Sequence, residues 1–204
     1  MKFFYAPASP FARKVHISLI ELGLQDNVEL LFTPVVPGKP NADYVKSQNP
    51  LGKIPALQLE SGETLFDSTV ICDYLDSISS TIKLLPEEGT DRFNALTRST
   101  LAHGICESAV TLRYETFLRP EPQQWSVWID DHWDKIDRTL TWFESNKSKW
   151  QGDVDLAQIT LACALGYLDF RTPEYNWRDK NPAIAQWFTL FSDRDSFQQT
   201  VPTA

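Results

Sequence analysis

The stretch Ser9-Pro10-Phe11-Ala12 directly follows a short apolar run near the start of the chain. A strand that leads through a turn into a helix beginning Cys-Pro-x-Cys is the usual setting of thiol–disulfide chemistry. Here the two cysteine positions hold Ser9 and Ala12, so the chain supplies no thiol at this place. A serine at a helix start either caps the helix or helps to stabilise an anion such as a thiolate in the positive potential of the helix end.

A second stretch whose residues could take part in binding or chemistry is QNPLGKIPAL, residues 48–57. Proline has no N–H for a strand ladder, so Pro55 belongs at the start or edge of a strand. If the Ile54–Pro55 bond is cis, the turn exposes the N–H and C=O of Ile54 to a peptide-like ligand, which would pair as an added strand. The alternative is a loop that only leads into an edge strand.

A third candidate is the pair Asp67-Ser68, which precedes an apolar helical pattern. An aspartate here is a good helix cap and needs no further role. The pair also offers a carboxylate for an ammonium group, and a hydroxyl with helix-end N–H groups for a carboxylate. The ammonium group and the carboxylate that would be bound in this way are the two charged groups of an amino acid.

The elements that would position these residues form a small α/β pattern over residues 1–79. The apolar periodicity, the Gly23 helix stop and the Ser61-Gly62 turn predict alternating strands and helices. One parallel strand pair and one antiparallel hairpin follow from their order. The predicted elements are a strand at 2–5, a helix at 11–23, a strand at 28–35, a helical turn after 43, strands at 55–60 and 63–66, and a helix from 67.

From about residue 90 onward the strand signals disappear, and apolar residues recur at helical spacing. All seven tryptophans lie here, between Trp125 and Trp187. VDLAQI, residues 154–159, predicts a helix start with Asp155 as N-cap and Gln158 as its capping-box partner. The apolar run behind it, residues 160–170, predicts a buried central helix. A second, all-helical domain is therefore expected over residues 90–204.

The composition excludes several classes of function. A net charge of −8 argues against nucleic acids and anionic membranes as partners, because both need a basic face. Cys72, Cys106 and Cys163 are widely spaced, which favours buried thiols in a reducing compartment over disulfides or metal ligands. The three histidines show no metal-ligand spacing, so no metal is expected. The apolar run near the N-terminus is too short for a signal peptide, and a cytoplasmic location is expected.

In combination, these features resemble a known family. Ser-Pro-Phe at residues 9–11, Asn-Pro-Leu-Gly-Lys-Ile-Pro at 49–55 and Asp-Ser at 67–68 precede an all-helical half that closes with SDRDSFQQTVP. This order resembles the cytosolic glutathione S-transferases, especially small bacterial members, over essentially the whole chain. The resemblance implies a thioredoxin-like α/β domain at residues 1–79 and an all-α domain at 90–204 that contributes the electrophile site and the dimer interface. It also implies a homodimer and a role in detoxification.

The same resemblance makes Ser9 the catalytic residue, donating a hydrogen bond to the sulfur of bound glutathione, a co-substrate. The thiolate would then attack a small hydrophobic electrophile. Tyr5 ends the first strand near the place where other classes of the family keep a catalytic tyrosine, so it is a rival to Ser9. Arg13 and Lys14 follow in the same helix and either tune the potential of the site or form its solvated face.

Further glutathione contacts are implied by the matching motifs. The backbone of Ile54 would pair with the cysteinyl portion, with Pro55 cis, and two further pairs would hold the two ends of the tripeptide. These are Asp67 and Ser68 for the γ-glutamyl end, and Gln48 and Lys53 for the glycyl carboxylate.

Possible electrophile-site residues are Tyr5, Phe11, His103, Glu107 and Tyr114. The last three share one face of a predicted helix, for which a solvated or dimer-facing stripe is an equal alternative.

Two other functions remain open at this point. One is a non-catalytic interaction or regulatory module built on the same fold, although such a module has no physical need of Pro55 or of Asp67-Ser68. The other is a glutathione-dependent thiol oxidoreductase, which normally needs a cysteine in the site to form a mixed disulfide with glutathione.

Overall fold

The computed structural model describes residues 1–203 and divides into two compact units. Unit 1 comprises Met1–Pro86 and the described residues from Ser196 onward, and unit 2 comprises Glu87–Asp195. The sequence predicts that residues 90–204 belong to the helical domain. The described residues from Ser196 onward instead group with the α/β unit. Local sequence patterns do not predict this long-range arrangement.

Unit 1 is built on a four-stranded mixed sheet with the order β2-β1-β3-β4. β1 pairs parallel with β2 and antiparallel with β3, and β3 pairs antiparallel with β4. This is the parallel pair and hairpin that the sequence predicts. The strands span Lys2–Tyr5 (β1), Glu29–Phe32 (β2), Ala56–Gln58 (β3) and Thr64–Leu65 (β4).

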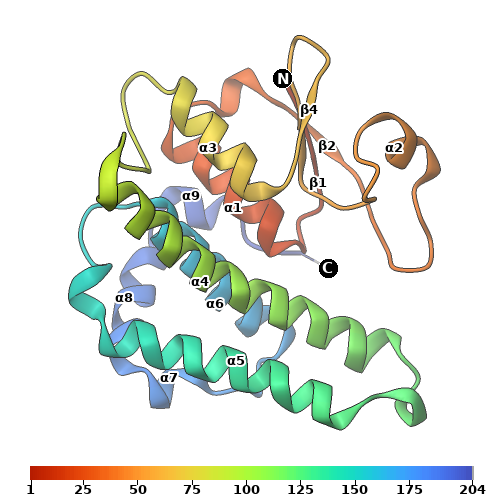
Figure 1. The fold of residues 1–204 in the computed structure, drawn as a ribbon, viewed down its shortest axis with the longest axis vertical. Helices are drawn as coiled ribbons and strands as arrows, with labels where there is room; N and C mark the ends of the chain where they lie inside the picture. The colour runs from red at the N-terminus through yellow and green to blue at the C-terminus, as the bar shows by residue number, and fades with distance from the viewer. Residues whose placement is uncertain (204) are drawn as a thin grey trace. The chain divides into compact units, whose positions relative to one another are not determined.

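Within residues 1–86, three α-helices and one short 3-10 helix accompany this sheet. α1 and α3 lie side by side on one of its faces, and α2 lies on the other (Figure 1). Lys14 on α1 contacts Thr69 on α3, and one turn later Ser18 contacts Cys72, so the two helices run parallel and start at the same end. The helices span Pro10–Glu21 (α1), Gln25–Asn27 (the 3-10 helix η1), Ala42–Ser47 (α2) and Ser68–Ile78 (α3).

Phe197, in the short helix α9 (Asp195–Gln198), and Thr200, which follows it, contact Arg13 on α1. Arg13 donates through Nη2 to the carbonyl of Phe197 (2.9 Å) and through Nε to the hydroxyl of Thr200 (3.3 Å). Its guanidinium also stacks on the Phe197 ring, with Cζ 3.7 Å from the centroid. These contacts explain why the end of the chain belongs to unit 1.

Unit 2 is helical throughout, as the sequence predicts. α6 is buried along most of its length, in agreement with its nearly uniform apolar composition, and packs against α4. No helix within residues 1–203 is long and apolar enough to cross a membrane. The elements are α4 (Gly89–Arg113), the π-helix η2 (Tyr114–Leu118), η3 (Glu121–Gln123), α5 (Ser126–Ser145), η4 (Lys147–Lys149), α6 (Leu156–Arg171), α7 (Trp177–Lys180) and α8 (Pro182–Ser192).

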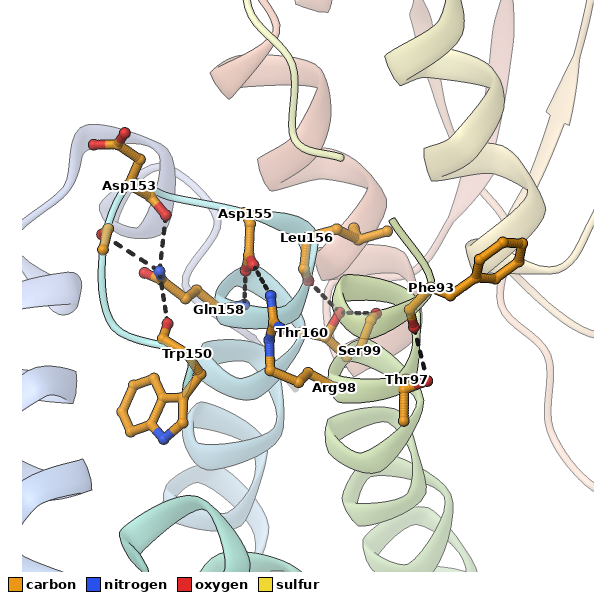
Figure 2. Close-up of polar contacts among 11 residues, drawn as sticks. Phe93, Thr97, Arg98, Ser99, Trp150, Asp153, Asp155, Leu156, Gln158 and Thr160 are labelled. Atoms are coloured by element: carbon orange, nitrogen blue, oxygen red, sulfur yellow. Dashed lines mark hydrogen bonds and ion pairs between the residues drawn. The ribbon is translucent and has the colours of Figure 1, made fainter. Parts of the chain in front are cut away.

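Figure 2 shows the polar contacts that start α6. Asp155 is the N-cap: its Oδ1 accepts from the Gln158 N–H (2.8 Å) and its Oδ2 accepts from Arg98 on α4 (3.0 Å). The Gln158 side chain does not reach back to the cap as predicted. It donates to the carbonyls of Trp150 (3.0 Å) and Asp153 (2.9 Å). An amide can donate to loop carbonyls and a carboxylate cannot, which explains why glutamine suits this position.

Candidate functional site

The start of α1 holds Ser9 in an extended conformation, with φ −86° and ψ 121°. Its hydroxyl oxygen accepts from the Ala12 N–H at 3.2 Å, and Pro10 occupies the first helical position. The cap that the sequence predicts is therefore present. Ser9 is half-buried, and its hydroxyl hydrogen is not required by the cap.

Arg13 and Lys14 do not form a solvated face. Their exposed fractions are 5% and 1%, so both cations lie inside unit 1. The Lys14 ammonium donates to the Thr69 hydroxyl (3.3 Å) in the first turn of α3. Burial raises the pKa of the Cys72 thiol, and the charge of Lys14 acts in the opposite direction. A positive charge thus lies between α1 and the first turn of α3.

The cis-proline loop, residues 48–55, is braced by two side chains that converge on one carbonyl. The Tyr44 hydroxyl (2.7 Å) and the Asn49 amide (2.8 Å) both donate to the carbonyl of Lys53. Gly52 adopts φ 62°, a left-handed conformation that favours glycine. The Ile54–Pro55 bond is cis, as the family resemblance implies.

Ile54 is presented at the end of this braced loop, immediately before the start of β3. Neither its N–H nor its C=O has a hydrogen-bond partner among residues 1–203. Lys53 beside it is exposed. Gln48 accepts through Oε1 from the Thr64 hydroxyl (3.0 Å), which anchors the loop to β4 and leaves the amide N–H groups of Gln48 available.

Asp67 and Ser68 start α3. Asp67 is exposed, follows a cis peptide bond from Phe66, and caps the helix by accepting from the Thr69 N–H at 2.7 Å. Ser68 has an exposed fraction of 1%, and its hydroxyl has no hydrogen-bond partner within the described residues. Buried polar atoms are normally hydrogen-bonded, and an exception calls for an explanation.

The strand registers bring these three motifs to one edge of unit 1. Phe4 near the end of β1 pairs with Ala56 at the start of β3, and Leu57 pairs with Leu65 at the end of β4. The helix start after β1, the cis-proline loop before β3 and the helix start after β4 therefore follow from neighbouring points of the sheet. The parallel alignment of α1 and α3, visible in Figure 1, agrees with this.

The possible electrophile residues divide between the two units. Tyr5 stacks on Phe3, with 5.6 Å between ring centroids, and borders a cavity of about 180 Å³ that the C-terminal residues also line. Phe11 is half-buried in the first turn of α1.

The other three candidates belong to unit 2. His103 and Glu107 lie one turn apart on α4, with Nε2 and Oε1 3.7 Å apart, and the Glu107 side chain is 66% exposed. Tyr114 directly follows the last residue of the same helix and begins η2, and burial raises the pKa of its hydroxyl.

Sequence reasoning missed the contributions of Tyr44 and Asn49 and left the role of Lys14 open. The first two act on a carbonyl up to nine residues away, and Lys14 is buried only because α3 packs beside α1. Asn49 carried a partial signal as part of an Asn-Pro turn, but nothing in that motif indicates what its amide binds.

Comparisons with known proteins cover both units. Models of the glutathione S-transferase N-terminal and C-terminal domains match residues 8–78 and 126–189. The uncharacterized GST-like protein YibF of Escherichia coli K12 is 33% identical over 207 residues, covering 99% of this chain and 98% of that protein.

Solved structures give the same result. A glutathione transferase family member from Pseudomonas fluorescens Pf-5 with bound glutathione has a TM-score of 0.96 at 42% identity, covering 100% of this chain and 99% of that chain. A structure of a Pf-5 family member with bound S-(propanoic acid)-glutathione gives 0.92 at 41%, covering 99% of each chain. A transferase from Methylobacillus flagellatus KT with bound glutathione gives 0.90 at 32%, again with 99% of each chain covered. The chain belongs to the glutathione S-transferase family.

Proposed function

We propose that the protein is a glutathione transferase in which Ser9 activates the thiol of bound glutathione. The observation that carries the proposal is the meeting of three motifs at one edge of unit 1, each offering groups suited to a different part of the tripeptide. Bound glutathione in solved relatives at 42% and 32% identity supports it.

In this proposal the peptide portion of glutathione pairs with the unpartnered N–H and C=O of Ile54. The γ-glutamyl carboxylate accepts from Ser68 and the first N–H groups of α3, which accounts for the orphaned Ser68 hydroxyl. Asp67 accepts from the ammonium group. The exposed Lys53 and the amide N–H groups of Gln48 bind the glycyl carboxylate.

The energy that Ser9 must supply is modest. A cysteine-like thiol has a pKa of about 8.5, and each unit of lowering requires about 1.4 kcal/mol. A hydrogen bond to a charged acceptor contributes about 1.5–3 kcal/mol, and a helix dipole contributes up to ~1 kcal/mol. Ser9 and the start of α1 together lower the thiol pKa by about one to three units on this scale.

The chemical step is a substitution or an addition. The thiolate sulfur forms a bond to an electrophilic carbon, and the leaving group departs with its bonding pair or the acceptor takes up a proton. Disulfide exchange is disfavoured because Cys72, Cys106 and Cys163 are all buried. A small electrophile, detoxification as its purpose, a homodimer and a cytoplasmic location complete the proposal.

The test compares Ser9→Gly with Ser9→Thr and Tyr5→Phe. Glycine is nearly as good an N-cap as serine, so Ser9→Gly removes the hydroxyl at a stability cost of only a few tenths of a kcal/mol. We expect it to raise the pKa of bound glutathione by about one unit and to slow conjugation of an aryl halide about tenfold at pH 6.5. The pKa is measured from thiolate absorbance of the complex.

Ser9→Thr keeps a hydroxyl and should remain close to wild type, as should Tyr5→Phe. A raised thiol pKa in Tyr5→Phe, with none in Ser9→Gly, would assign the role to Tyr5 instead. Isothermal titration with glutathione tests the proposal as a whole, and failure of the wild-type protein to bind would remove it.

A further inference from the structure

Two arginines, Arg113 and Arg171, are the last residues of α4 and α6, two helices that pack against each other in unit 2. Arg98 on α4 binds Asp155 at the start of α6, which aligns the two helices at one end. Arg113 lies 15 residues after Arg98, and Arg171 lies 16 residues after Asp155. Because α4 and α6 run parallel with an equal rise per residue, Arg113 and Arg171 reach the same level. Figure 1 shows the two helices side by side.

The two guanidinium groups are close enough to repel each other. Burial lowers the pKa of Arg113, and the positive charge of Arg171 lowers it further. Each guanidinium lies over an aromatic ring: Arg113 Cζ is 3.3 Å from the Phe117 centroid, and Arg171 Cζ is 4.1 Å from the Phe170 centroid. The rings hold the cations in place without neutralising them.

No carboxylate neutralises this pair. Within residues 1–203, neither Arg113 nor Arg171 forms an ion pair, and Nε of Arg171 is buried without a hydrogen-bond partner. The neighbouring acids are engaged elsewhere. Glu115 accepts from the Arg119 side chain and the Trp125 N–H, whereas Asp169 accepts from Arg178 and Trp177. An uncompensated pair of cations is notable in a chain with a net charge of −8.

Two tyrosines complete the cluster. The pKa of Tyr167 is raised to about 12, mainly by burial and also by the nearby Tyr114, whereas Arg171 and Arg113 act in the opposite direction. Burial also raises the pKa of Tyr114. Both phenols are therefore neutral at physiological pH and able to donate hydrogen bonds.

We propose that Arg113, Arg171, Tyr114 and Tyr167 form an anion-binding site that takes the carboxylate of the electrophilic substrate. This inference rests on the proposed transferase function and specifies its substrate class as electrophiles that carry a carboxylate. A guanidinium fork matches a carboxylate geometrically, and an anion beside two like charges relieves their repulsion. The rings of Phe117 and Phe170 offer apolar surface beside the charge for an organic acid.

The activity test uses two aryl halides that differ only in charge, 4-chloro-3,5-dinitrobenzoate and its methyl ester. In both, the glutathione sulfur forms a bond to the ring carbon that carries chlorine, and chloride leaves with the bonding pair. We expect Arg113→Met and Arg171→Met to raise KM for the acid at least tenfold while leaving KM for the ester and for glutathione within twofold of wild type.

Two variants serve as controls. Arg138→Met removes an exposed arginine of α5 and should change KM for neither substrate. Arg113→Lys keeps the charge and loses the fork, so an intermediate KM for the acid is expected. Equal losses for acid and ester, or no loss for either, would overturn the carboxylate site.

A binding measurement separates this inference from the proposed function. The same benzoate is titrated without glutathione and followed by quenching of tryptophan fluorescence. Binding that disappears in both methionine variants supports the anion site even if the wild-type protein fails to bind glutathione, which would remove the transferase proposal alone. Binding that is unchanged in the variants, alongside normal conjugation of the ester, would remove the anion site alone.

Discussion

A hydroxyl group has one donor and two acceptor positions, so Ser9 does not need to choose between two roles. It accepts from the Ala12 N–H in the present structure, and the same oxygen can donate its hydrogen to a sulfur. The sequence raised capping and thiol activation as alternatives, and the geometry makes them compatible. Ser68 differs, because its hydroxyl is buried and makes no hydrogen bond within residues 1–203 that would explain its presence.

Replacing Ser68 by alanine tests whether that hydroxyl serves a ligand. Because it has no partner within the described residues, its removal should change the free energy of unfolding by less than about 0.5 kcal/mol. Loss of a hydrogen bond to a charged carboxylate should weaken glutathione binding about tenfold or more. Thermal unfolding and isothermal titration measure the two effects separately.

Ser79 provides a matched control at the other end of α3. Its hydroxyl is likewise buried and has no hydrogen-bond partner in the part of the chain that the structure describes, and its exposed fraction is 5%. Ser79→Ala should leave both stability and glutathione binding unchanged. Equal losses of binding in the two variants would show that Ser68 has no special role.

At the level of elements, the sequence predicted most of what is local. β1, α1, α3 and the start of α6 follow from apolar periodicity and cap residues that lie within a few positions of each other. The predicted role of Gln158 as capping-box partner was wrong. Its amide binds carbonyls in a loop whose path the capping-box pattern does not specify. The Arg98–Asp155 ion pair could not be predicted from local patterns either, because it joins two helices that are far apart in the sequence.

The cap of α6 should be worth more than a helix cap alone. Asp155→Ala removes the acceptor for the Gln158 N–H and leaves Arg98 without its ion-pair partner. We expect the free energy of unfolding to fall by about 1–2 kcal/mol, with the melting temperature decreasing by about 2–4 °C for each kcal/mol.

Asp155→Asn separates the two contributions. It keeps an acceptor for the cap and removes the charge that faces Arg98, so an intermediate melting temperature is expected. A melting temperature equal to that of the alanine variant would mean that the ion pair, and not the cap, carries the effect.

At the level of the whole molecule, the sequence correctly indicated an α/β unit and a helical unit but not the assignment of the last residues. Phe197 and Thr200 bind Arg13, which lies more than 180 positions earlier, and no periodicity links such distant segments. The Arg113–Arg171 pair escaped notice likewise, because only the parallel packing of α4 and α6 brings it together. Long-range pairing is the part of the fold and the site that local patterns do not encode.

Removing residues 196–204 should therefore damage unit 1 although the cut lies far from it in sequence. The deletion takes away two acceptors of the buried Arg13, and each unmet donor on a charged group costs about 1–3 kcal/mol or more. We expect a lower melting temperature and weaker glutathione binding. A shorter deletion, residues 201–204, spares both acceptors and should behave like wild type in both measurements.

The docking of the C-terminal residues on α1 also bears on how the protein is made. Residues from Ser196 onward are translated after the entire helical unit, yet they complete the unit that emerged first. Arg13 cannot form its hydrogen bonds to Phe197 and Thr200 until the ribosome has added more than 180 further residues. Unit 1 is thus begun first and finished last, and unit 2 is free to fold during the interval.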